Sequence, residues 1–344
     1  MRAASEGGAL VNVLIVGLGS MGKRRIRNLK HLGVESLVGC DPREDRRAEA
    51  QARYGVAVAS DFAAALAARP DAVVISTPPD RHAEPMHAAA RAGIPFFVEA
   101  GVPDPGLDAV AALCREKGIL GAPSATMRFH PSVRNLRELV ASGRAGRPLS
   151  FTHHCGQYLP DWHPWEDYRG FYVSRRETGA CREIVPFELN WLTGLFGPVA
   201  QVAAQKAKLT ALDADIDDIY QLQLRFESGV LGQLQVDVIS RVPYRQFKLL
   251  SEEAVVTWDS TTRTVSCFRG EAKEWEHLRE PEGRVEAGYV NAEDMYIDEM
   301  RQFLDALAGR APWPHSLADD QRILDVLLAA EESAASGRAV ALAR

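Results

Sequence analysis

The first part of the chain alternates short apolar runs with segments whose apolar residues recur at helical spacing. The apolar runs cover residues 10–17, 36–41, 71–77 and 94–100, and the helical segments that follow them cover residues 21–32, 43–53, 81–92 and 107–118. Strands that alternate with helices at this spacing form parallel sheets with crossover helices. The runs are apolar throughout, which is typical of strands covered on both faces. Residues 10–127 therefore predict an α/β domain with a parallel sheet, preceded by a loose leader at residues 1–9.

After about residue 148 the pattern changes to alternating apolar and polar positions. Residues 218–227 read DIYQLQLRFE, in which every second side chain is apolar. The alternation continues at residues 230–238, 243–250, 254–258 and 263–268, and helical spacing occurs at residues 131–142, 187–195, 292–308 and 317–335. A period of two predicts an antiparallel sheet with one apolar face. We therefore predict a second domain over residues 128–344, of the α+β class with an open, mainly antiparallel sheet.

Composition and charge narrow the classes of protein and of partner. The 344 residues suffice for two domains of ordinary size, and 46% hydrophobic with 25% charged residues is the balance of a globular protein. The formal charge of −6 disfavours nucleic acid and anionic membranes as partners. No apolar run approaches the ~20 residues that span a bilayer. Five scattered cysteines lack disulfide or metal-ligand spacing, so we predict buried thiols in a cytoplasmic protein and no metal site.

A glycine pattern directly follows the first predicted strand. Gly17, Gly19 and Gly22 have G-x-G-x-x-G spacing between a strand and a helix, and Asp41 ends the next strand. This context is typical of a Rossmann dinucleotide site, where the glycines allow a tight turn and a close approach of the pyrophosphate to the helix N-terminus. Asp41 would accept hydrogen bonds from ribose hydroxyls, which favours NAD over NADP, whereas Arg43 could take a ribose phosphate. The alternative is a glycine-rich turn without a ligand, with Asp41 capping the next helix.

The other strand ends of the parallel sheet are expected at the same site, because ligands bind beyond the carboxyl ends of such strands. Besides the glycines, Asp41 and Arg43, we predict cofactor contacts from Ser20, Met21, Ser76, Thr77, Pro78, His82 and Glu99. His82 stands at a helix start, where it could instead cap or pack. Glu99 ends the fourth strand, where it could transfer a proton or form a structural hydrogen bond.

Several short motifs together resemble the Gfo/Idh/MocA family of oxidoreductases. They are GLGSMG at 17–22, STPP at 76–79 with His82, Glu99 after the fourth strand, RFHP at 128–131 and ETGACREIVPFELNWLTGLFGPV at 177–199. The closing residues resemble the family's terminal helix, so the resemblance runs through nearly the whole chain. It implies a Rossmann domain, a second domain with an open antiparallel sheet, and homodimers or homotetramers joined through that sheet. It also implies that sugars, sugar nucleotides or cyclitols are oxidised or reduced with NAD(P).

Two departures from the family pattern fall on its proton-handling residues. Family members usually have Glu-Lys-Pro where this chain has Glu99-Ala100-Gly101, and the lysine is the usual proton handler. Aligned from Gly179, the family's aspartate, histidine and later aspartate fall on Glu183, Phe187 and Asn190. A shift of one position would instead place Glu188 where the histidine belongs. The usual lysine and histidine are therefore missing.

The segment THHCGQYLPDWHPWEDYRGFY at 152–172 concentrates aromatic and polar side chains. Aromatic faces and hydrogen-bonding groups suit a carbohydrate ring. From this segment and the family-like motifs, we predict substrate contacts by Arg128, His154, Trp162, Trp165 and Glu188. Tyr158 and His163 are candidates for proton transfer, because histidine titrates near neutral pH. Alternatively, a segment rich in proline and tryptophan forms a structural lid or an oligomer contact.

These patterns lead to one principal hypothesis and two alternatives. The principal hypothesis is an NAD-dependent oxidoreductase acting on a carbohydrate-type hydroxyl or keto group, in which Glu99, Glu183, Tyr158 or His163 replaces the lysine as acid/base. A related alternative is transient hydride transfer, which would permit epimerisation or elimination without net redox change. A different class is a non-catalytic, NAD-binding sensor or scaffold, which the loss of lysine and histidine would suit.

Overall fold

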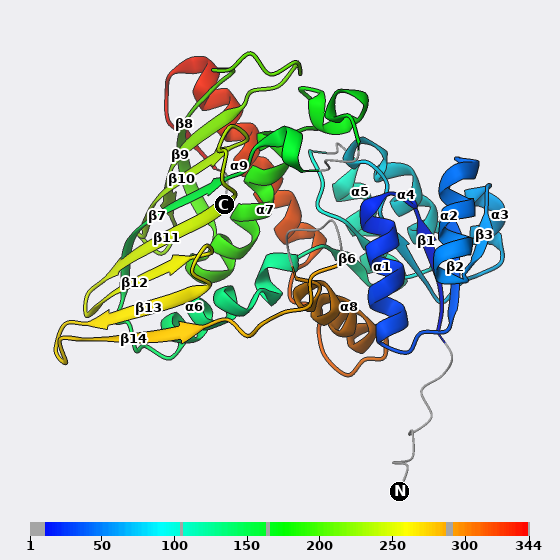
Figure 1. The fold of residues 1–344 in the computed structure, drawn as a ribbon, viewed down its shortest axis with the longest axis horizontal. Coiled ribbons are helices and arrows are strands. Elements are labelled where there is room, and N and C mark those ends of the chain that lie inside the picture. The colour runs from blue at the N-terminus through cyan, green and yellow to red at the C-terminus, as the bar shows by residue number, and fades with distance from the viewer. Residues whose placement is uncertain (1–10, 104–105, 163–165, 287–291, 343–344) are drawn as a thin grey trace, which may run out of the picture. The chain divides into compact units, whose positions relative to one another are not determined.

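The chain forms two compact units in the computed structural model, which describes residues 11–103, 106–162, 166–286 and 292–342 (Figure 1). The first unit comprises Met1–Glu99, Asp104–Ser124 and Tyr296–Ala318, and the second comprises Ala100–Pro103, Ala125–Met295 and Asp319–Arg344. The first contains a parallel sheet and the second a mainly antiparallel one, which confirms the predicted fold class. Unlike the predicted continuous domain at 128–344, the second unit is interrupted by residues that belong to the first.

The first unit contains a six-stranded sheet in the order β3-β2-β1-β4-β5-β6, with parallel neighbours. Its strands are β1 Asn12–Val16, β2 Ser36–Cys40, β3 Ala57–Ala59, β4 Ala72–Ile75, β5 Phe96–Val98 and β6 Gly121–Pro123. Its helices are α1 Ser20–His31, α2 Glu44–Tyr54, α3 Phe62–Ala67, α4 Ala83–Ala92, α5 Leu107–Lys117 and α8 Asp294–Leu307, which enters this unit at Tyr296. The chain goes from β1 to β2 on one side and returns to β4 on the other. In such sheets this reversal marks the place where ligands bind.

Helix α8 packs into the core of the parallel sheet. Met300 and Phe303 are fully buried, and the Phe303 ring lies edge-on to Phe97 of β5 with ring centroids 5.8 Å apart. The assignment of residues 292–308 to the second domain, with its antiparallel sheet, was therefore wrong for most of this helix. The apolar spacing of this segment predicts a helix, but it does not specify which sheet the helix covers.

The second unit contains a nine-stranded sheet in the order β14-β13-β12-β11-β7-β10-β9-β8-β15. Its strands are β7 Pro148–Gly156, β8 Val199–Ala207, β9 Ile219–Phe226, β10 Leu231–Asp237, β11 Tyr244–Ser251, β12 Ala254–Asp259, β13 Thr264–Arg269, β14 Glu274–Arg279 and β15 Val340–Ala341. Neighbouring strands are antiparallel except β7 and β10, which run parallel. The alternation of apolar and polar residues leaves one face apolar and the other polar.

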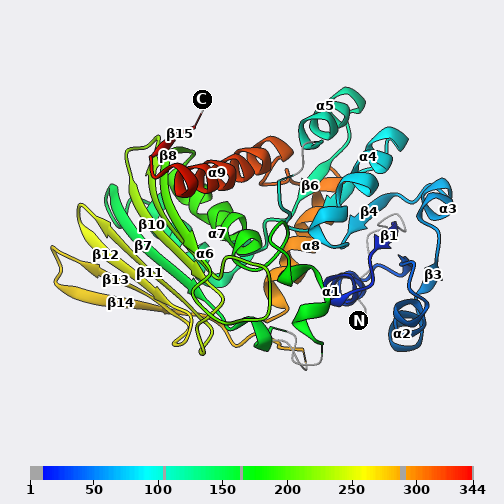
Figure 2. The same ribbon diagram turned by 90° about the horizontal axis from the view of Figure 1, so that it is seen from above.

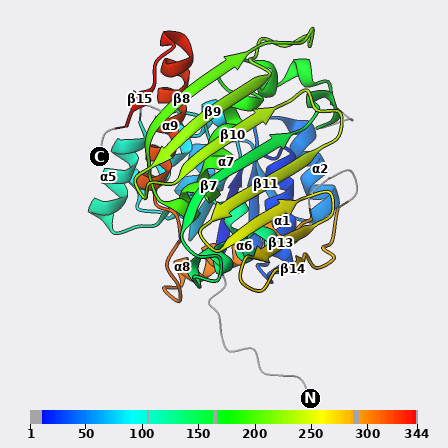
Figure 3. The same cartoon turned by 90° about the vertical axis from the view of Figure 1, so that its left-hand side faces the viewer.

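Helices cover the apolar face of this sheet (Figure 2). They are α6 Pro131–Ala141, α7 Cys181–Phe196 and α9 Leu317–Ser336. Helix α7 begins six residues before the predicted segment 187–195 and contains Pro186, which sequence patterns usually place at a helix boundary. Figure 3 shows the sheet from its polar face, where the strands lie side by side in front of the helices. Among the described residues, none of the helices has the length and apolarity of a membrane span.

Candidate active site

The three glycines of the β1–α1 turn have the spatial roles that a dinucleotide site requires. Gly17 has a φ of +91°, and a Cβ there would lie 2.5 Å from the Ser76 carbonyl oxygen. A Cβ on Gly22 would lie 1.8 Å from the Gly17 oxygen, whereas one on Gly19 would have its nearest neighbour 3.8 Å away, at Arg46. Gly17 and Gly22 therefore allow close packing of turn and helix, and Gly19 leaves space on the outside. Ser20 and Met21 begin α1, whose first N–H groups suit a pyrophosphate.

Asp41 lies beside this turn and is 3% exposed. Its carboxylate accepts the Leu18 N–H at 2.8 Å and the Arg43 N–H at 2.9 Å. These bonds fix the carboxylate next to the glycines and leave further lone pairs for ribose hydroxyls. The alternative that Asp41 caps α2 is not supported, because the N-cap of that helix is Arg43, whose side chain makes no capping hydrogen bond among the described residues; Asp41 binds the N–H of Arg43 itself, which precedes the helix. The residues of the turn and Asp41 together fit an NAD molecule.

Arg46, which the sequence analysis missed, has its guanidinium near the Asp41 carboxylate, whereas the neighbouring Arg47 donates to the Asp41 backbone carbonyl at 2.8 Å. The Nη1 of Arg46 lies 3.6 Å from the Asp41 carboxylate, and Arg46 is also the neighbour of Gly19. The Arg43 side chain instead pairs with exposed Asp45 at 2.6 Å. Arg43 was singled out because it is nearer in sequence, but Arg46 follows nearly one helical turn later and lies between the Asp41 carboxylate and Gly19.

Glu99 is held in an ion pair at the end of β5. Arg25 of α1 donates to both of its carboxylate oxygens, at 2.6 and 2.8 Å, and the Ser76 hydroxyl donates at 3.2 Å. Arg25 is fully buried and also pairs with buried Glu299 at 2.8 Å. Burial alone would lower the pKa of Arg25, but the charges of Glu99 and Glu299 outweigh it and raise the pKa. Proton transfer by Glu99 would require breaking this bidentate pair, so the geometry favours the structural alternative.

His82 and its neighbours form a self-contained turn after β4. The imidazole is 4% exposed, and its Nε2 lies 3.0 Å from the Thr77 carbonyl, which can only accept a hydrogen bond. The Thr77 hydroxyl donates to the Arg81 carbonyl, and Pro78 precedes the one-turn helix Pro79–Arg81. The packing alternative for His82 thus matches the structure better than a pocket role.

In the second unit, α7 presents two of the candidate acids on opposite sides. Glu183 in its first turn is half-buried and accepts a hydrogen bond from the Tyr172 hydroxyl at 3.2 Å. Phe187 follows one turn later on the same side. Glu188 is fully buried and accepts from Trp191 at 2.8 Å, from Arg245 at 2.8 Å and from His153 at 2.9 Å.

Glu188 therefore links α7 to the sheet, and the prediction that it contacts substrate is not supported. Burial by itself would raise the pKa of Glu188, but Arg245 and His153 outweigh it and hold the pKa well below its usual range. His153 completes the link: its second ring nitrogen lies 3.2 Å from the Gln246 carbonyl. In the alignment from Gly179, Glu183 takes the place of the family's acid, and this correspondence stays a prediction.

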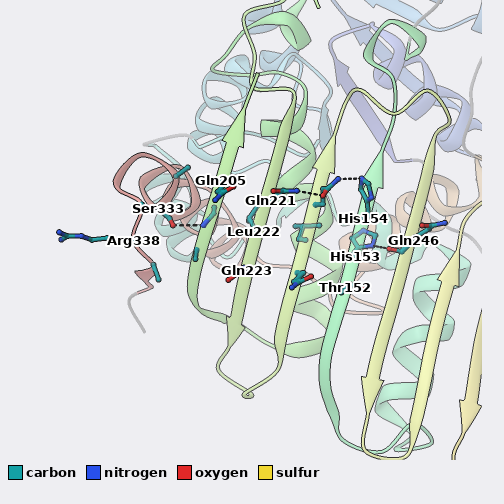
Figure 4. A pocket seen from close by; sticks show the side chains of 18 residues that line it. Thr152, His153, His154, Gln205, Gln221, Leu222, Gln223, Gln246, Ser333 and Arg338 are labelled. Atoms are coloured by element: carbon teal, nitrogen blue, oxygen red, sulfur yellow. Dashed lines mark hydrogen bonds between the residues drawn. The ribbon is translucent and has the colours of Figure 1, made fainter. Parts of the chain in front are cut away.

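His154 points to the polar face of the sheet, opposite α7, as expected for the neighbour of His153 on a strand (Figure 4). Its Nε2 lies 2.6 Å from the Asp237 carboxylate, and the Tyr244 hydroxyl lies 3.0 Å from the ring. Burial would raise the pKa of Asp237, but hydrogen bonds from His154 and Ser240 outweigh it and lower the pKa. His154 therefore lies on the opposite side of the sheet from Glu183 and Glu188, and its predicted contact with substrate is not supported by this geometry.

The remaining predicted residues are in several environments. Arg128 donates to the Asn190 side chain and to the Asn190 carbonyl, both at 2.9 Å, so it anchors α7 and is not a free substrate contact. The Arg241 guanidinium carbon lies over the Tyr158 ring, 3.8 Å from the ring centroid. Trp162 is half-buried, and its indole N–H has no hydrogen-bond partner within the described part of the chain. His163 and Trp165 lie outside the described residues.

Comparisons with known proteins identify the family. Residues 11–120 match the profile described as "Oxidoreductase family, NAD-binding Rossmann fold", and residues 133–257 match the "GFO/IDH/MocA C-terminal domain". The chain belongs to the Gfo/Idh/MocA family of oxidoreductases, as its motifs predicted.

Relatives and solved structures agree with this membership. Inositol 2-dehydrogenase of Streptomyces avermitilis is 36% identical over 42% of this chain and 44% of its own length, so the match spans less than half of that relative. Myo-inositol dehydrogenase Hyg17 of Streptomyces leeuwenhoekii is 27% identical over 95% of this chain and 98% of its own. Levoglucosan dehydrogenase in complex with NADH shares the fold, with a TM-score of 0.85 at 21% identity over 97% of this chain and 99% of that one.

Proposed function

We propose that this protein is an NAD-dependent dehydrogenase or reductase acting on a hydroxyl or keto group of a sugar, sugar nucleotide or cyclitol. The observation that carries the proposal is the glycine turn with Asp41. Gly19 leaves space for a pyrophosphate, whereas Gly17 and Gly22 are packed so closely that neither has room for a side chain. Family membership supports the reaction class, and the two inositol dehydrogenases support a polyol-type substrate.

Bound NAD would supply the acceptor for the hydride of a carbinol carbon. The chain must then hold the substrate and accept the hydroxyl proton as the carbonyl forms. The buried indole N–H of Trp162 is a donor suited to a carbohydrate hydroxyl. Because Ala100 and Phe187 cannot exchange protons, we propose an acid/base other than the family's lysine and histidine.

The surroundings of the four candidates rank them for proton transfer. Glu99 is ion-paired with Arg25, and Tyr158 is stacked against Arg241. Glu183 stands in the first turn of α7, half-buried and in contact with a tyrosine hydroxyl. His163 lies outside the described residues and stays a prediction. Glu183 is therefore the candidate that the described geometry favours.

We also propose a homodimer or homotetramer joined through the polar face of the nine-stranded sheet. Across β11 to β14, cross-strand pairing places four apolar side chains in one row on this face: Leu250, Val255, Phe268 and Trp275. Trp275 is 50% exposed and Leu250 43%. The neighbouring groove of about 770 Å³ is lined by hydrogen-bonding side chains, among them several glutamines, His154 and Arg338 (Figure 4). An exposed apolar row of this kind favours a protein partner.

The five buried, free thiols support a cytoplasmic location.

A screen of pooled sugars, sugar acids, sugar nucleotides and cyclitols with NAD tests the function. A dehydrogenase would give reduced cofactor with at least one pool. Exchange of a carbon-bound deuterium without net reduced cofactor would instead support transient hydride transfer. NADH binding with neither reduced cofactor nor deuterium exchange would support a non-catalytic, NAD-binding sensor. The absence of the family's usual lysine and histidine favours that alternative. Absence of NADH binding would contradict the cofactor assignment itself.

A further inference from the structure

Tyr172 and Glu183 are brought together by two short segments of the second unit. Tyr172 begins the one-turn helix Tyr172–Ser174, and Glu183 lies in the first turn of α7. The tyrosine hydroxyl donates to Glu183 Oε1 at 3.2 Å, and both side chains are half-buried. Tyr172 was not among the residues singled out from the sequence, because its partner is eleven residues away in a different element.

The backbone around this pair is held tightly. The Thr178 hydroxyl donates to the Tyr172 carbonyl at 2.7 Å. A Cβ on Gly179 would lie 2.1 Å from the Val173 oxygen, so only glycine permits the turn to close against the start of α7. Ala180 then adopts a φ of +54°, a conformation that is costly for alanine and that persists only where the surroundings impose it. Strain of this kind at the start of α7 indicates that the position of Glu183 relative to Tyr172 is fixed by the fold.

We propose that Tyr172 and Glu183 form the proton-handling pair of this protein, with the Tyr172 hydroxyl contacting the reacting hydroxyl of the substrate. The inference rests on the proposed function and specifies its acid/base. A phenol alone is a weak base at neutral pH, because it is already protonated below about pH 10. A carboxylate that accepts the phenol proton makes simultaneous transfer possible, so the tyrosine can gain one proton as it loses another.

The oxidation then balances as follows. The alcohol loses its carbinol hydrogen, with the bonding electron pair, to the nicotinamide ring. Its O–H bond breaks as the C=O bond forms, and the proton passes to the Tyr172 oxygen while the Tyr172 proton passes to Glu183. Glu183 releases this proton to water. The alcohol is oxidised by two electrons, NAD is reduced, and one proton is released; reduction of a ketone follows the reverse sequence.

The other side chains considered for proton transfer are less suited to it than Tyr172. Phe187 lies one turn after Glu183 on the same side of α7, where it adds an apolar surface but no proton acceptor. Tyr158, the other tyrosine considered, has its ring covered by Arg241. Tyr172 is instead in contact with a carboxylate, which is the partner that a proton relay requires.

The test compares Tyr172→Phe and Glu183→Gln with Tyr168→Phe, a control four residues earlier in the same segment. With the substrate found by the pooled screen, we expect kcat to fall at least ~100-fold in Tyr172→Phe, the usual contribution of general acid/base catalysis. NADH binding by fluorescence, and thermal unfolding, should stay as in the wild type, and Tyr168→Phe should keep full activity. In the Glu183→Gln variant, the pH profile of kcat should lose its acidic limb.

A second measurement does not depend on activity. The alkaline ultraviolet transition that Tyr172→Phe removes should move to lower pH in Glu183→Gln, because the phenolate then forms without a neighbouring negative charge. An unchanged transition, or full kcat in Tyr172→Phe, would overturn the pair while leaving the dehydrogenase intact. If the wild type reduced NAD with none of the pools, the proposed function would be overturned, and the role of the Tyr172–Glu183 pair with it.

Discussion

The preference for one nicotinamide cofactor depends on the charges of two neighbouring side chains. Asp41 is fixed by the Leu18 and Arg43 N–H groups, and Arg46 lies 3.6 Å from its carboxylate. A carboxylate binds ribose hydroxyls and repels a ribose phosphate, whereas a guanidinium attracts the phosphate. The Arg46 side chain is 30% exposed, so water screens its charge and its effect should be smaller than that of buried Asp41.

Replacing these residues should separate the two effects. Asp41→Ala should weaken NADH binding about tenfold or more, because hydrogen bonds to charged groups are lost, and should relieve discrimination against NADPH. Arg46→Ala should weaken NADPH binding more than NADH binding. Fluorescence titration of both cofactors measures this. Arg43→Ala serves as control, because that guanidinium pairs with exposed Asp45; a larger effect from Arg43 than from Arg46 would show that the assignment is reversed.

Glu99 shows what residue-level reasoning from sequence could and could not predict. Its place at a strand end beside the cofactor residues followed from the apolar run before it. Its partner Arg25 is 74 residues away on another element, and the three consecutive basic residues at 23–25, of which Arg24 and Arg25 are both buried, give no sign of which one reaches Glu99. Long-range charge pairing therefore decided whether the carboxylate was a free acid, and sequence spacing carries no information on such pairs.

At the scale of elements, helix α7 carries a structural glutamate on one side and the glutamate proposed for proton transfer on the other. One side carries Glu183 and Phe187, and the other carries Glu188, which binds β7 through His153 and β11 through Arg245. From the sequence, the position of the family's histidine fell on Phe187 or, with a shift of one position, on Glu188. The structure shows that Glu188 lies on the side of α7 that packs on the sheet, which is a property of three elements together and not of the sequence around α7.

The Glu188 contacts should make folding stability depend on pH. The pKa of Glu188 is depressed, so its stabilisation is complete above the unfolded-state value of about 4.3 and declines as pH falls below it. At neutral pH, Glu188→Gln should lower the free energy of unfolding by about 3 kcal/mol, because it leaves buried partners uncompensated. The difference from wild type should shrink in acid. Urea unfolding of the wild type and the variant at neutral and at acidic pH measures this, and the exposed substitution Glu138→Gln is the control. If the difference in the free energy of unfolding were the same at both pH values, the proposed role of Glu188 would be refuted.

The glycine turn offers a matched pair of substitutions. Gly22→Ala places a Cβ 1.8 Å from the Gly17 oxygen, so α1 must shift, and stability should fall by about 1–3 kcal/mol. Gly19→Ala meets no protein atom closer than 3.8 Å and should unfold like the wild type, yet bind NADH more weakly. Thermal unfolding and NADH titration distinguish the two. Undiminished NADH binding by Gly19→Ala would show that no phosphate approaches there.

At the scale of the whole molecule, long patterns were predictable and short ones were not. The four apolar runs and the alternating strands led to the correct fold class. Strands β3 and β6, of three residues each, are too short to show a period, and β14 carries charged residues at alternate positions. The assignment of α8 also failed, because an amphipathic helix fits any apolar surface.

The apolar row on the polar face of the sheet makes a prediction about assembly. The wild type should have the mass of a dimer or tetramer in light scattering after gel filtration. Trp275→Glu should lower that mass, because it places a charge beside Phe268, 5.3 Å between ring centroids. Trp275→Phe should retain the assembly. A monomeric wild type, or an unchanged mass in the Trp275→Glu variant, would exclude this surface as the interface.

The most direct test of the central claim is the near-ultraviolet absorbance of reduced nicotinamide in a single turnover. Wild-type protein, stoichiometric with NAD, is mixed with the cyclitol and sugar pools, and Gly19→Ala serves as the control for cofactor binding. We expect a reduced-cofactor band that appears with at least one pool in the wild type and is diminished in the control. NADH binding by the wild type without a band from any pool would contradict an NAD-dependent oxidoreductase of carbohydrate-type substrates.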